Sequence, residues 1–270
     1  MTEPTHPSPT DPEVQVPKAF VHGVPETSAI WNALVEELEL RGIGDIHLLT
    51  PPGFGAPAPQ GFEPDQASYC NWLIAELEAL GGNVDLVGHD WGAGHVFGAL
   101  EARPDLIRSW ATDSGGLIHA DYEWHDLARV FQTPDIGEQA VATMTDGEPT
   151  ERAAWLIAFG VPSDTAELVA AGQNEEMARC ILGLYRSAVQ PAMEDLGRRL
   201  ADTERRPGLV FIPTEDHFVG TEAMYADVAT SLGAQTLTMK GLNHWWMFGE
   251  GVAIAADALV AHWSAAAGTV

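Results

Sequence analysis

The stretch VDLVGHDWG, residues 84–92, decides the fold of this chain. Residues 84–87 form a short apolar run of the kind that fills a buried strand. The glycines at 88 and 92 bound a tight turn, and residues 93–102 continue as a helix. A strand, a tight turn and a helix in this order place Asp90 at the carboxyl end of a strand, which is where ligands bind in open α/β sheets.

Strands and helices alternate along most of the remaining sequence. Short apolar runs predict strands, and apolar residues at helical spacing predict helices, with Ser28 as the N-cap of the first helix. Alternation of this kind favours a mostly parallel, doubly wound α/β sheet. The expected strands cover residues 14–21, 46–49, 84–87, 107–112, 209–212 and 235–239, and the expected helices cover residues 28–40, 64–80, 93–102 and 253–263.

The alternation breaks in the middle of the chain. Residues 117–196 have a helical pattern without a convincing strand, so we expect a helical cap inserted into a core formed by residues 14–116 and 197–270. Residues 1–13 are rich in proline and are expected to form a disordered lead. The length of 270 residues, 46% of them hydrophobic, fits one α/β domain with an insertion better than two independent domains.

The chain is strongly acidic. It has 39 Asp and Glu residues against 13 Lys and Arg, and its net charge of −26 repels nucleic acid and anionic lipid, so we expect neither as a partner. No uncharged apolar stretch reaches the roughly 18 residues of a transmembrane helix, and the N-terminus lacks the features of a secretory signal. These observations predict a cytoplasmic protein, and they leave a homodimer open.

The two cysteines, Cys70 and Cys180, are far apart in the sequence and lie in helical segments. A reduced pair of small hydrophobic side chains is favoured over one long-range disulfide. Two cysteines at this spacing offer too few ligands for a metal site, and we expect neither a metal nor a cofactor.

Three features occur in an order that is typical of one fold. A Gly-x-Asp-x-Gly turn joins a strand to a helix, Asp216 follows the strand at 209–212, and His244 follows the last strand. From Ala19 onward the chain resembles the α/β-hydrolase fold, whose nucleophile elbow Gly-x-Ser-x-Gly here carries Asp in place of Ser. The segment before Ala19 is too short for the two N-terminal strands of many members, so we expect a shortened sheet.

The resemblance implies a catalytic triad. Asp90 would be the nucleophile, and His244 would be the general base. Asp216 would orient the histidine, with Glu215 from the same loop and Asp113 after the preceding strand as alternatives. Without the resemblance, Asp90 would be interpreted as a helix N-cap.

The same resemblance assigns neighbouring groups. The backbone N–H groups of Val24 and Trp91 would form an oxyanion hole. His89 precedes the nucleophile, so its side chain should point away from the site, and we interpret it as structural. His217 is expected to be a loop residue.

A carboxylate nucleophile determines the class of reaction. Attack of a carboxylate on an ester would give an anhydride, which is uphill, whereas a carboxylate can displace a leaving group from saturated carbon. The product would be an alkyl ester of Asp90, and water activated by His244 would then hydrolyse it. We therefore expect a hydrolase that acts on an epoxide or on a carbon–halogen bond.

The residues expected near the leaving group favour an epoxide. Epoxide hydrolases use cap tyrosines, and Tyr185 and Tyr122 lie in the expected cap. The sequence Gly-His-Asp-Trp-Gly around Asp90 is also more similar to epoxide hydrolases, although Val24 stands where they have an aromatic residue and the cap is shorter than theirs. Several tryptophans predict an apolar pocket for a small neutral hydrophobic substrate.

Other functions remain as alternatives. A haloalkane dehalogenase would use Trp91, but it would have Asn or a second Trp as its partner, and Val24 occupies the Asn position. Haloacetate dehalogenases carry an Arg after the nucleophile, which this chain lacks. A pathway-specific enzyme and a catalytically silent protein of the same fold are also open.

Overall fold

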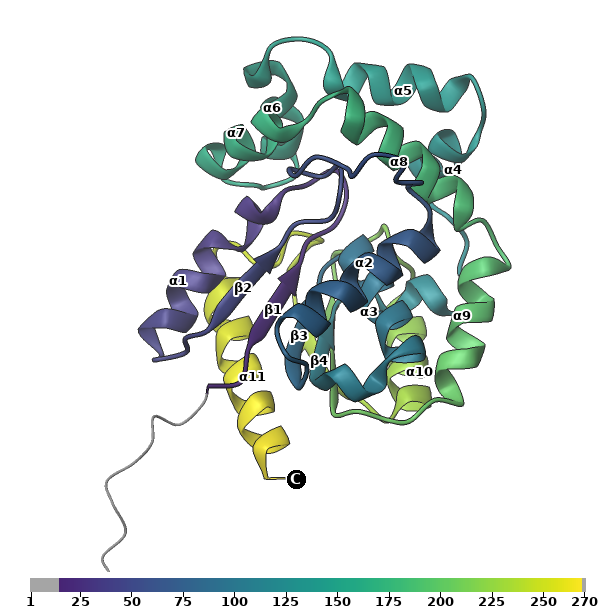
Figure 1. Ribbon diagram of the computed structural model, residues 1–270. Coiled ribbons are helices and arrows are strands. Elements are labelled where there is room, and N and C mark those ends of the chain that lie inside the picture. Colours follow the sequence, from purple (N-terminus) through teal and green to yellow (C-terminus); the bar gives the residue numbers. More distant parts are fainter. Residues whose placement is uncertain (1–14, 269–270) are drawn as a thin grey trace, which may run out of the picture.

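Residues 15–268 of the computed structural model are described here, and they contain one parallel sheet (Figure 1). The six strands follow the order β2-β1-β3-β4-β5-β6, and every neighbouring pair is parallel. The predicted shortened, doubly wound sheet is confirmed, and the expected lead at 1–13 lies outside the described residues. The strands are β1 Lys18–Val21, β2 Ile46–Leu49, β3 Val84–Gly88, β4 Ile107–Thr112, β5 Gly208–Pro213 and β6 Gln235–Met239.

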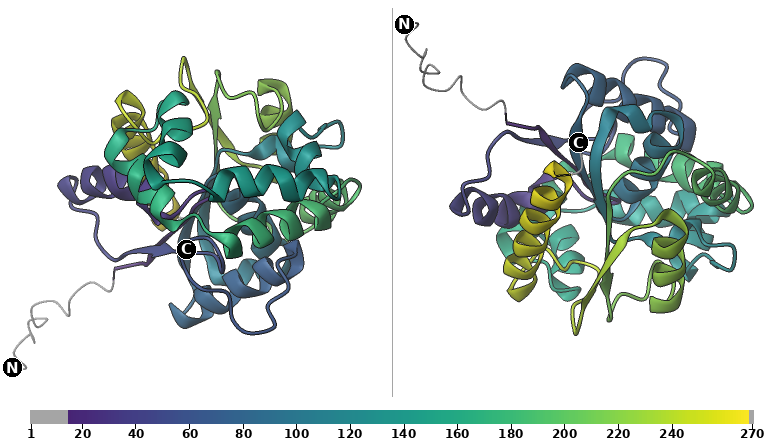
Figure 2. Two further views of the ribbon diagram at one scale, coloured as in Figure 1. Left: turned by 90° about the horizontal axis from the view of Figure 1, so that it is seen from above. Right: turned by 90° about the horizontal axis from the view of Figure 1, so that it is seen from below.

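Helices cover both faces of this sheet (Figure 2). Helices α1 and α11 pack together on one face, while α2, α3, α9 and α10 form a layer on the other. Within residues 15–268 no helix is long and apolar enough to cross a membrane. The core helices are α1 Asn32–Leu40, α2 Gln66–Ala79, α3 Trp91–Ala102, α9 Ala192–Ala201, α10 Glu222–Leu232 and α11 Glu250–Ala267.

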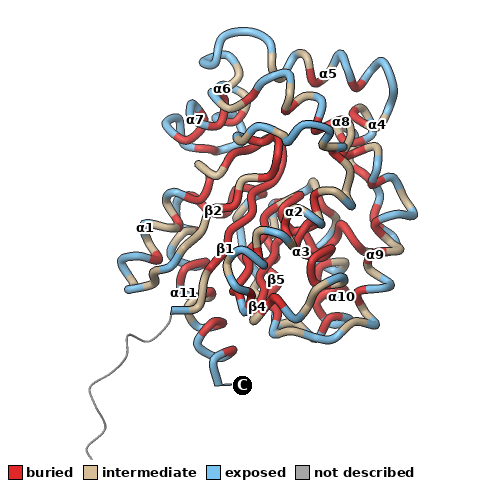
Figure 3. The backbone as a smooth tube through the Cα atoms, viewed as in Figure 1, coloured by how far each residue is buried: buried red, intermediate tan, exposed pale blue. Residues whose placement is uncertain are grey.

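The hydrophobic core is divided by the sheet into two clusters. Successive residues of a strand point to opposite faces. On β1, Ala19 and Val21 therefore pack into the cluster beneath α2 and α3, while Phe20 packs into the cluster beneath α1 and α11. Both faces of the central strands are buried (Figure 3). Double burial explains why these strands have apolar runs in place of strict alternation.

A helical cap covers the carboxyl ends of the strands (Figure 1). The chain enters the cap after the 3₁₀ turn η3, Gly115–Ile118. Within the described residues, the cap adds no strand to the sheet. The cap helices are α4 Asp126–Gln132, α5 Ile136–Thr145, α6 Pro149–Ala158, α7 Ser163–Gly172 and α8 Glu175–Ser187.

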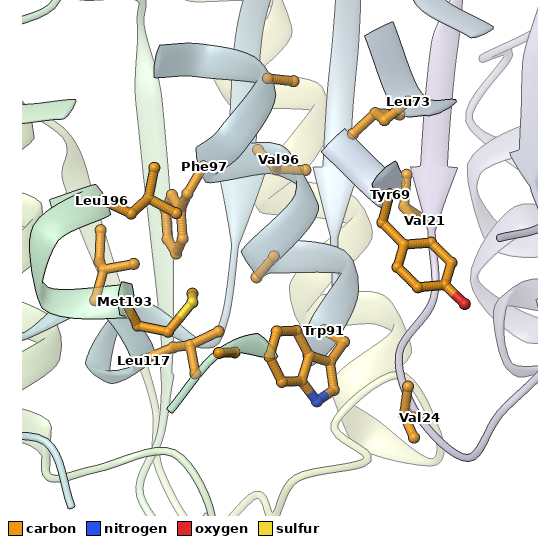
Figure 4. Packing of buried hydrophobic residues seen from close by; sticks show 14 of the residues in the cluster. Val21, Val24, Tyr69, Leu73, Trp91, Val96, Phe97, Leu117, Met193 and Leu196 are labelled. Atoms are coloured by element: carbon orange, nitrogen blue, oxygen red, sulfur yellow. The ribbon is translucent and has the colours of Figure 1, made fainter. Parts of the chain in front are cut away.

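Helix α9 belongs with the core layer, so the expected cap boundary at residue 196 falls inside a helix. Met193 and Leu196 on its apolar face lie against Phe97 of α3 and Leu117 of η3 (Figure 4). The cap proper therefore ends before Ala192.

Two local expectations differ from the structure. Ser28 makes no side-chain capping bond, because the 3₁₀ turn η1, Ser28–Trp31, begins at this residue and precedes α1. Helix α10 was not among the expected elements. Its N-cap is Thr221, whose hydroxyl accepts the Met224 N–H, and Gly233 ends it in the left-handed conformation. Both cysteines are unpaired.

Candidate active site

Asp90 occupies a strained turn between β3 and α3. Its backbone angles are φ 52° and ψ −121°, a region that residues other than glycine rarely adopt. Neighbouring glycines make the turn fit. A Cβ on Gly92 would lie 2.1 Å from the Val21 carbonyl oxygen, and a Cβ on Gly23 would lie 2.3 Å from the Asp90 Cβ. The sheet thus brings the loop after β1 directly against the Asp90 side chain.

His244 lies between two carboxylates. Its Nδ1 is 2.9 Å from Asp216 Oδ2, and its Nε2 is 3.8 Å from Asp90 Oδ2. The other oxygen of Asp216 accepts the Phe218 N–H at 2.8 Å. The loops after β3, β5 and β6 therefore converge on one point, although they come from distant parts of the sequence.

The two alternative acids lie elsewhere. The Glu215 side chain is 59% exposed, and within the described residues its only ionic neighbour is His217, at 4.0 Å. Asp113 is buried, but its Oδ1 accepts the backbone N–H of Asp90 at 3.1 Å and its Oδ2 pairs with His89. Of the three acids considered, Asp216 is the one that hydrogen-bonds to His244.

Burial and neighbouring charges shift the pKa values of these groups. Burial raises the pKa of Asp90 to about 6, although the charges of His244 and His89 oppose the rise. Burial also lowers the pKa of His244, but the Asp216 carboxylate outweighs it and leaves that pKa above its ordinary value. For Asp216, the paired His244 outweighs burial, and the pKa lies below its ordinary value.

One oxygen of Asp90 accepts a backbone hydrogen bond. The Val24 N–H donates to Asp90 Oδ1 at 2.9 Å. Trp91 begins α3, and an N–H in the first turn of a helix has no acceptor within the helix. Figure 4 shows Val24 and Trp91 at the same end of the molecule, beyond the strands. Asp90 Oδ2, in contrast, faces His244.

A buried ionic network lies directly behind the site. His89 points away from the cavity, as expected, with Nδ1 bonded to Asp113 and Nε2 at 3.2 Å from Glu26. Burial lowers the pKa of His89, but the two carboxylates raise it well above its ordinary value. The Trp245 indole N–H also donates to Glu26, at 2.6 Å. Sequence reasoning overlooked Glu26, whose signal is its position three residues after Gly23 in the turn that also carries Val24.

One set of buried groups in residues 15–268 has the spacing of metal ligands. Glu26, His89 and His244 each present one ligand atom, and these atoms lie within 4.8 Å of one another. Both nitrogens of His89 are already paired with carboxylates, so a cationic His89 has no lone pair for a metal ion. The set is better described as an ionic network than as a metal centre.

Two small cavities adjoin Asp90. One has a volume of about 30 Å³ and also touches His244 and Tyr185. The other has a volume of about 10 Å³ and contacts both expected tyrosines, Tyr122 and Tyr185. Residues that sequence reasoning did not assign to the site, or judged to be packing, complete the walls: Pro25, Leu117, Trp124, His125, Leu127, Phe131, Met144, Trp155, Phe218, Val219 and Trp245.

The two tyrosines differ in their hydrogen bonds. The Tyr122 hydroxyl donates to the Phe218 carbonyl at 3.0 Å, so its proton is already engaged. The Tyr185 ring packs edge-on against Trp91 at 5.2 Å between ring centres, and its hydroxyl oxygen is hydrogen-bonded to the Trp91 side chain. Burial and the Asp90 charge raise the pKa of Tyr185 well above its ordinary value, which keeps the phenol protonated.

A larger chamber lies among the helices of the cap. Its volume is about 370 Å³, and it shares Leu127, Met144 and Trp155 with the cavity of about 30 Å³ at Asp90. We call these three side chains, which line both spaces, the neck. The rest of the chamber wall consists of Ala140, Thr143, Asp146, Glu151, Arg152 and Gln173.

The parallel sheet, the elbow between β3 and α3 and the converging His244 and Asp216 define a protein of α/β-hydrolase type. The chain belongs to the α/β hydrolase family, whose profile matches residues 19–258.

Solved structures with the same fold include several hydrolases. Haloalkane dehalogenase DbeA from Bradyrhizobium elkani is 20% identical with a TM-score of 0.67, over 95% of this chain and 94% of that one. An ancestral haloalkane dehalogenase is 18% identical with a TM-score of 0.71, over 94% of each chain. E-2-(acetamidomethylene)succinate hydrolase is 19% identical with a TM-score of 0.67, over 93% of this chain and 92% of that one. At these identities the likeness concerns the fold.

Proposed function

We propose that this protein is a hydrolase that opens epoxides to diols through an alkyl ester of Asp90. The observation that supports it best is the position of His244, with Nδ1 bonded to Asp216 and Nε2 at 3.8 Å from Asp90 Oδ2. This arrangement suits a base that activates water beside an ester of Asp90.

In the proposed reaction, the two oxygens of Asp90 have different roles. Oδ1 accepts the Val24 N–H, and Oδ2 is free to attack the less hindered carbon of the epoxide. The new Oδ2–carbon bond forms as the ring carbon–oxygen bond breaks, and the departing oxygen takes the proton of Tyr185. The carbonyl oxygen of the ester is then Oδ1, which already accepts the Val24 N–H, a donor of the kind that stabilises an oxyanion.

Hydrolysis of the ester restores the enzyme. His244 takes a proton from water, and the hydroxide adds to the Asp90 carbonyl carbon. The tetrahedral intermediate collapses to the Asp90 carboxylate and the diol. The proton held by His244 passes to Tyr185. The overall reaction therefore converts one epoxide and one water molecule into one diol.

The substrate that fits is neutral and mainly apolar. The walls around Asp90 are aromatic and aliphatic, and the space of about 30 Å³ there accepts only the reacting end of a molecule. The remainder would extend through the neck into the outer chamber. We further propose that the protein acts in the cytoplasm, without nucleic acid or membrane as a partner.

Trapping of the ester tests this function. Styrene oxide and linear 1,2-epoxyalkanes are offered to the wild type, to Asp90→Asn and to His244→Gln. We expect diol from the wild type, none from Asp90→Asn, and a mass adduct on the Asp90 peptide in His244→Gln. The proposal is wrong if a broad panel of epoxides gives neither diol nor adduct.

A haloalkane dehalogenase is the second candidate, and one observation favours it. The indoles of Trp91 and Trp124 stack at 5.7 Å between ring centres beside Asp90, and the buried Trp124 N–H has no partner among the described residues. The Trp124 N–H would suit a departing halide, and some of the similar structures are haloalkane dehalogenases. Bromide release from 1-bromobutane, faster than diol formation from 1,2-epoxybutane, would favour this candidate.

A further inference from the structure

We propose that the neutral imidazole of His125 donates a hydrogen bond from Nε2–H to the leaving oxygen and is a catalytic residue of the first chemical step. The inference rests on the proposed function, because it needs Asp90 to displace a leaving group. His125 would be the second hydrogen-bond donor to the leaving oxygen, beside Tyr185, because the Tyr122 hydroxyl is bonded elsewhere.

His125 stands at the junction of the two cavities. It lines both the space of about 30 Å³ and the space of about 10 Å³, and Asp90 and Tyr185 are the other residues common to both. Its ring packs edge-on against Phe218 at 5.4 Å between ring centres, and Phe218 packs in turn against His244 at 5.2 Å. The imidazole is thus fixed in the aromatic wall next to the nucleophile.

A capping bond determines which nitrogen of His125 carries the proton. His125 is the N-cap of α4, and its Nδ1 accepts the Ala128 N–H at 3.2 Å. A nitrogen that accepts a hydrogen bond is unprotonated, so the single proton of the neutral ring lies on Nε2. Within residues 15–268, Nε2 has no hydrogen-bond partner of its own. Burial, followed by the nearby charge of His244, lowers the His125 pKa to about 4, so the ring is neutral at physiological pH.

The second tyrosine cannot fill this role in the observed arrangement. Tyr122 donates its proton to the Phe218 carbonyl, which leaves only lone pairs on its oxygen. Tyr185 alone would face the developing alkoxide. A neutral imidazole is a suitable additional donor, because it stabilises an oxyanion without transferring its own proton.

In the proposed step, proton transfer and hydrogen bonding are separate tasks. Asp90 Oδ2 bonds to carbon, the carbon–oxygen bond breaks, and the oxygen receives the proton of Tyr185. His125 keeps its proton and shortens its hydrogen bond to that oxygen as negative charge develops. His125 then has no part in the hydrolysis of the ester, where His244 is the base.

Two substitutions distinguish the proposed Nε2–H donor of His125 from the role of its Nδ1 in capping α4. In His125→Asn, the short amide can still accept the Ala128 N–H, but it places no donor where Nε2 stood. In His125→Gln, the amide nitrogen can approach the former Nε2 position, while the cap is lost. His217→Asn is the matched control, because the His217 side chain is 80% exposed.

The test measures the two chemical steps separately with 1,2-epoxyoctane. Formation of the Asp90 ester is followed by intact mass in the His244→Gln background, and its hydrolysis is followed by rapid quench in enzyme with His244. We expect His125→Asn to slow ester formation about 100-fold and to leave hydrolysis within about threefold. His125→Gln should retain ester formation within about tenfold while melting at a lower temperature, and His217→Asn should change neither step.

The outcomes distinguish this inference from the proposed function. If His125→Asn forms the ester as fast as the parent, or if both steps slow equally, the inference is wrong and the proposed function stands. If His125→Asn fails to fold, slow ester formation in a folded His125→Gln would overturn the inference, and near-parent formation would support it. If the parent forms no ester with any epoxide, the proposed function fails first.

Discussion

The Asp90 carboxylate holds its negative charge in surroundings that disfavour it. Its pKa rises to about 6 through burial, while His244, His89 and the Val24 N–H reduce the rise. A carboxylate that is poorly solvated but still ionised at neutral pH is a better nucleophile than one surrounded by water. Reactivity at this residue is therefore linked to a loss of folding stability.

The raised pKa of Asp90 predicts how the free energy of unfolding changes with pH when this carboxylate is removed. Because the folded state binds the Asp90 proton more tightly than the unfolded state, Asp90 reduces stability as pH rises from about 4 to about 6. The shift corresponds to about 3 kcal/mol above that range. We expect Asp90→Asn to be more stable than the wild type at pH 8 and nearly equal at pH 4 in urea unfolding. A constant difference between these pH values would contradict the pKa shift.

Asp216 and Asp113 are predicted to behave differently when each is changed to Asn. Asp216→Asn should slow hydrolysis of the Asp90 ester by about 10³-fold or more, because His244 loses the carboxylate that orients it. Its melting temperature should fall as well, because the ion pair that lowers the pKa of Asp216 stabilises the folded state. Asp113→Asn should act mainly on stability and lower it by about 3 kcal/mol, because it leaves the buried His89 with one carboxylate. Ester accumulation in Asp113→Asn and not in Asp216→Asn would reverse the assignment.

The elbow between β3 and α3 shows what an element needs beyond its apolar pattern. The pattern of residues 84–92 predicted the strand, the turn and the helix, and β3 and α3 occur there. The same glycines also maintain the contact with β1, which comes from a distant segment. Gly92 permits contact with the Val21 carbonyl, and Gly23 permits contact with Asp90.

A methyl group at the elbow should therefore destabilise the fold. We expect Gly92→Ala to lower the free energy of unfolding by about 3 kcal/mol, because its Cβ would lie 2.1 Å from a backbone oxygen that cannot move away. Gly44→Ala is the control, since its nearest neighbour is the flexible end of Gln15. Equal effects of the two substitutions in chemical denaturation would contradict the role of Gly92.

Other elements show where sequence patterns are insufficient. The strand at Ile46–Leu49 was predicted with its observed bounds, because a short β-branched and apolar run lies between turn residues. Ser28 was expected to cap a helix, but a 3₁₀ turn precedes α1. Ile30 and Trp31 of this turn are buried in the core. The cap boundary was placed within α9, because a helix of the core layer and a helix of the cap have the same periodicity.

The candidate site was predictable only where the fold fixes positions. Asp90, Asp216 and His244 follow strands, so strand order alone brings them together. His125 and Trp124 lie in an irregular segment before α4, and no periodicity indicates which way such side chains point. The capping bond of His125 becomes visible only when the start of α4 is known.

At the scale of the whole molecule, the small cavity at Asp90 adjoins a larger chamber that is lined by residues of the cap. The neck of Leu127, Met144 and Trp155 lines both the small cavity and the chamber of about 370 Å³. Arg152 lines the chamber, but it donates to the carbonyls of Thr145, Gly147 and Ala170 and so is engaged in holding the cap together. The rest of the wall is mixed: it is apolar at Leu127, Ala140, Met144 and Trp155, and polar or acidic at Thr143, Asp146, Glu151 and Gln173.

A large side chain placed in the chamber should lower activity on long substrates more than on short ones. We expect Ala140→Trp to lower kcat/KM for 1,2-epoxydecane at least about 30-fold, because each excluded methylene group forfeits about 0.8 kcal/mol of burial. The value for 1,2-epoxypropane, which reaches only the inner cavity, should stay within about twofold. Gln139→Trp places the same side chain on the exposed neighbouring position of α5 and should affect neither substrate. An equal loss for both epoxides would exclude the chamber as a binding space.

The narrow inner cavity also has a consequence for competition among nucleophiles. Once the reacting end of a substrate occupies the space of about 30 Å³, little more than a water molecule fits beside the ester, and a bound alkyl chain would close the neck behind it. The ester would then partition only to water, even in solutions rich in methanol or hydroxylamine. Turnover in 1 M methanol should leave Asp90 unmethylated and the enzyme active, and the cap would thus protect the protein from its own reactive intermediate.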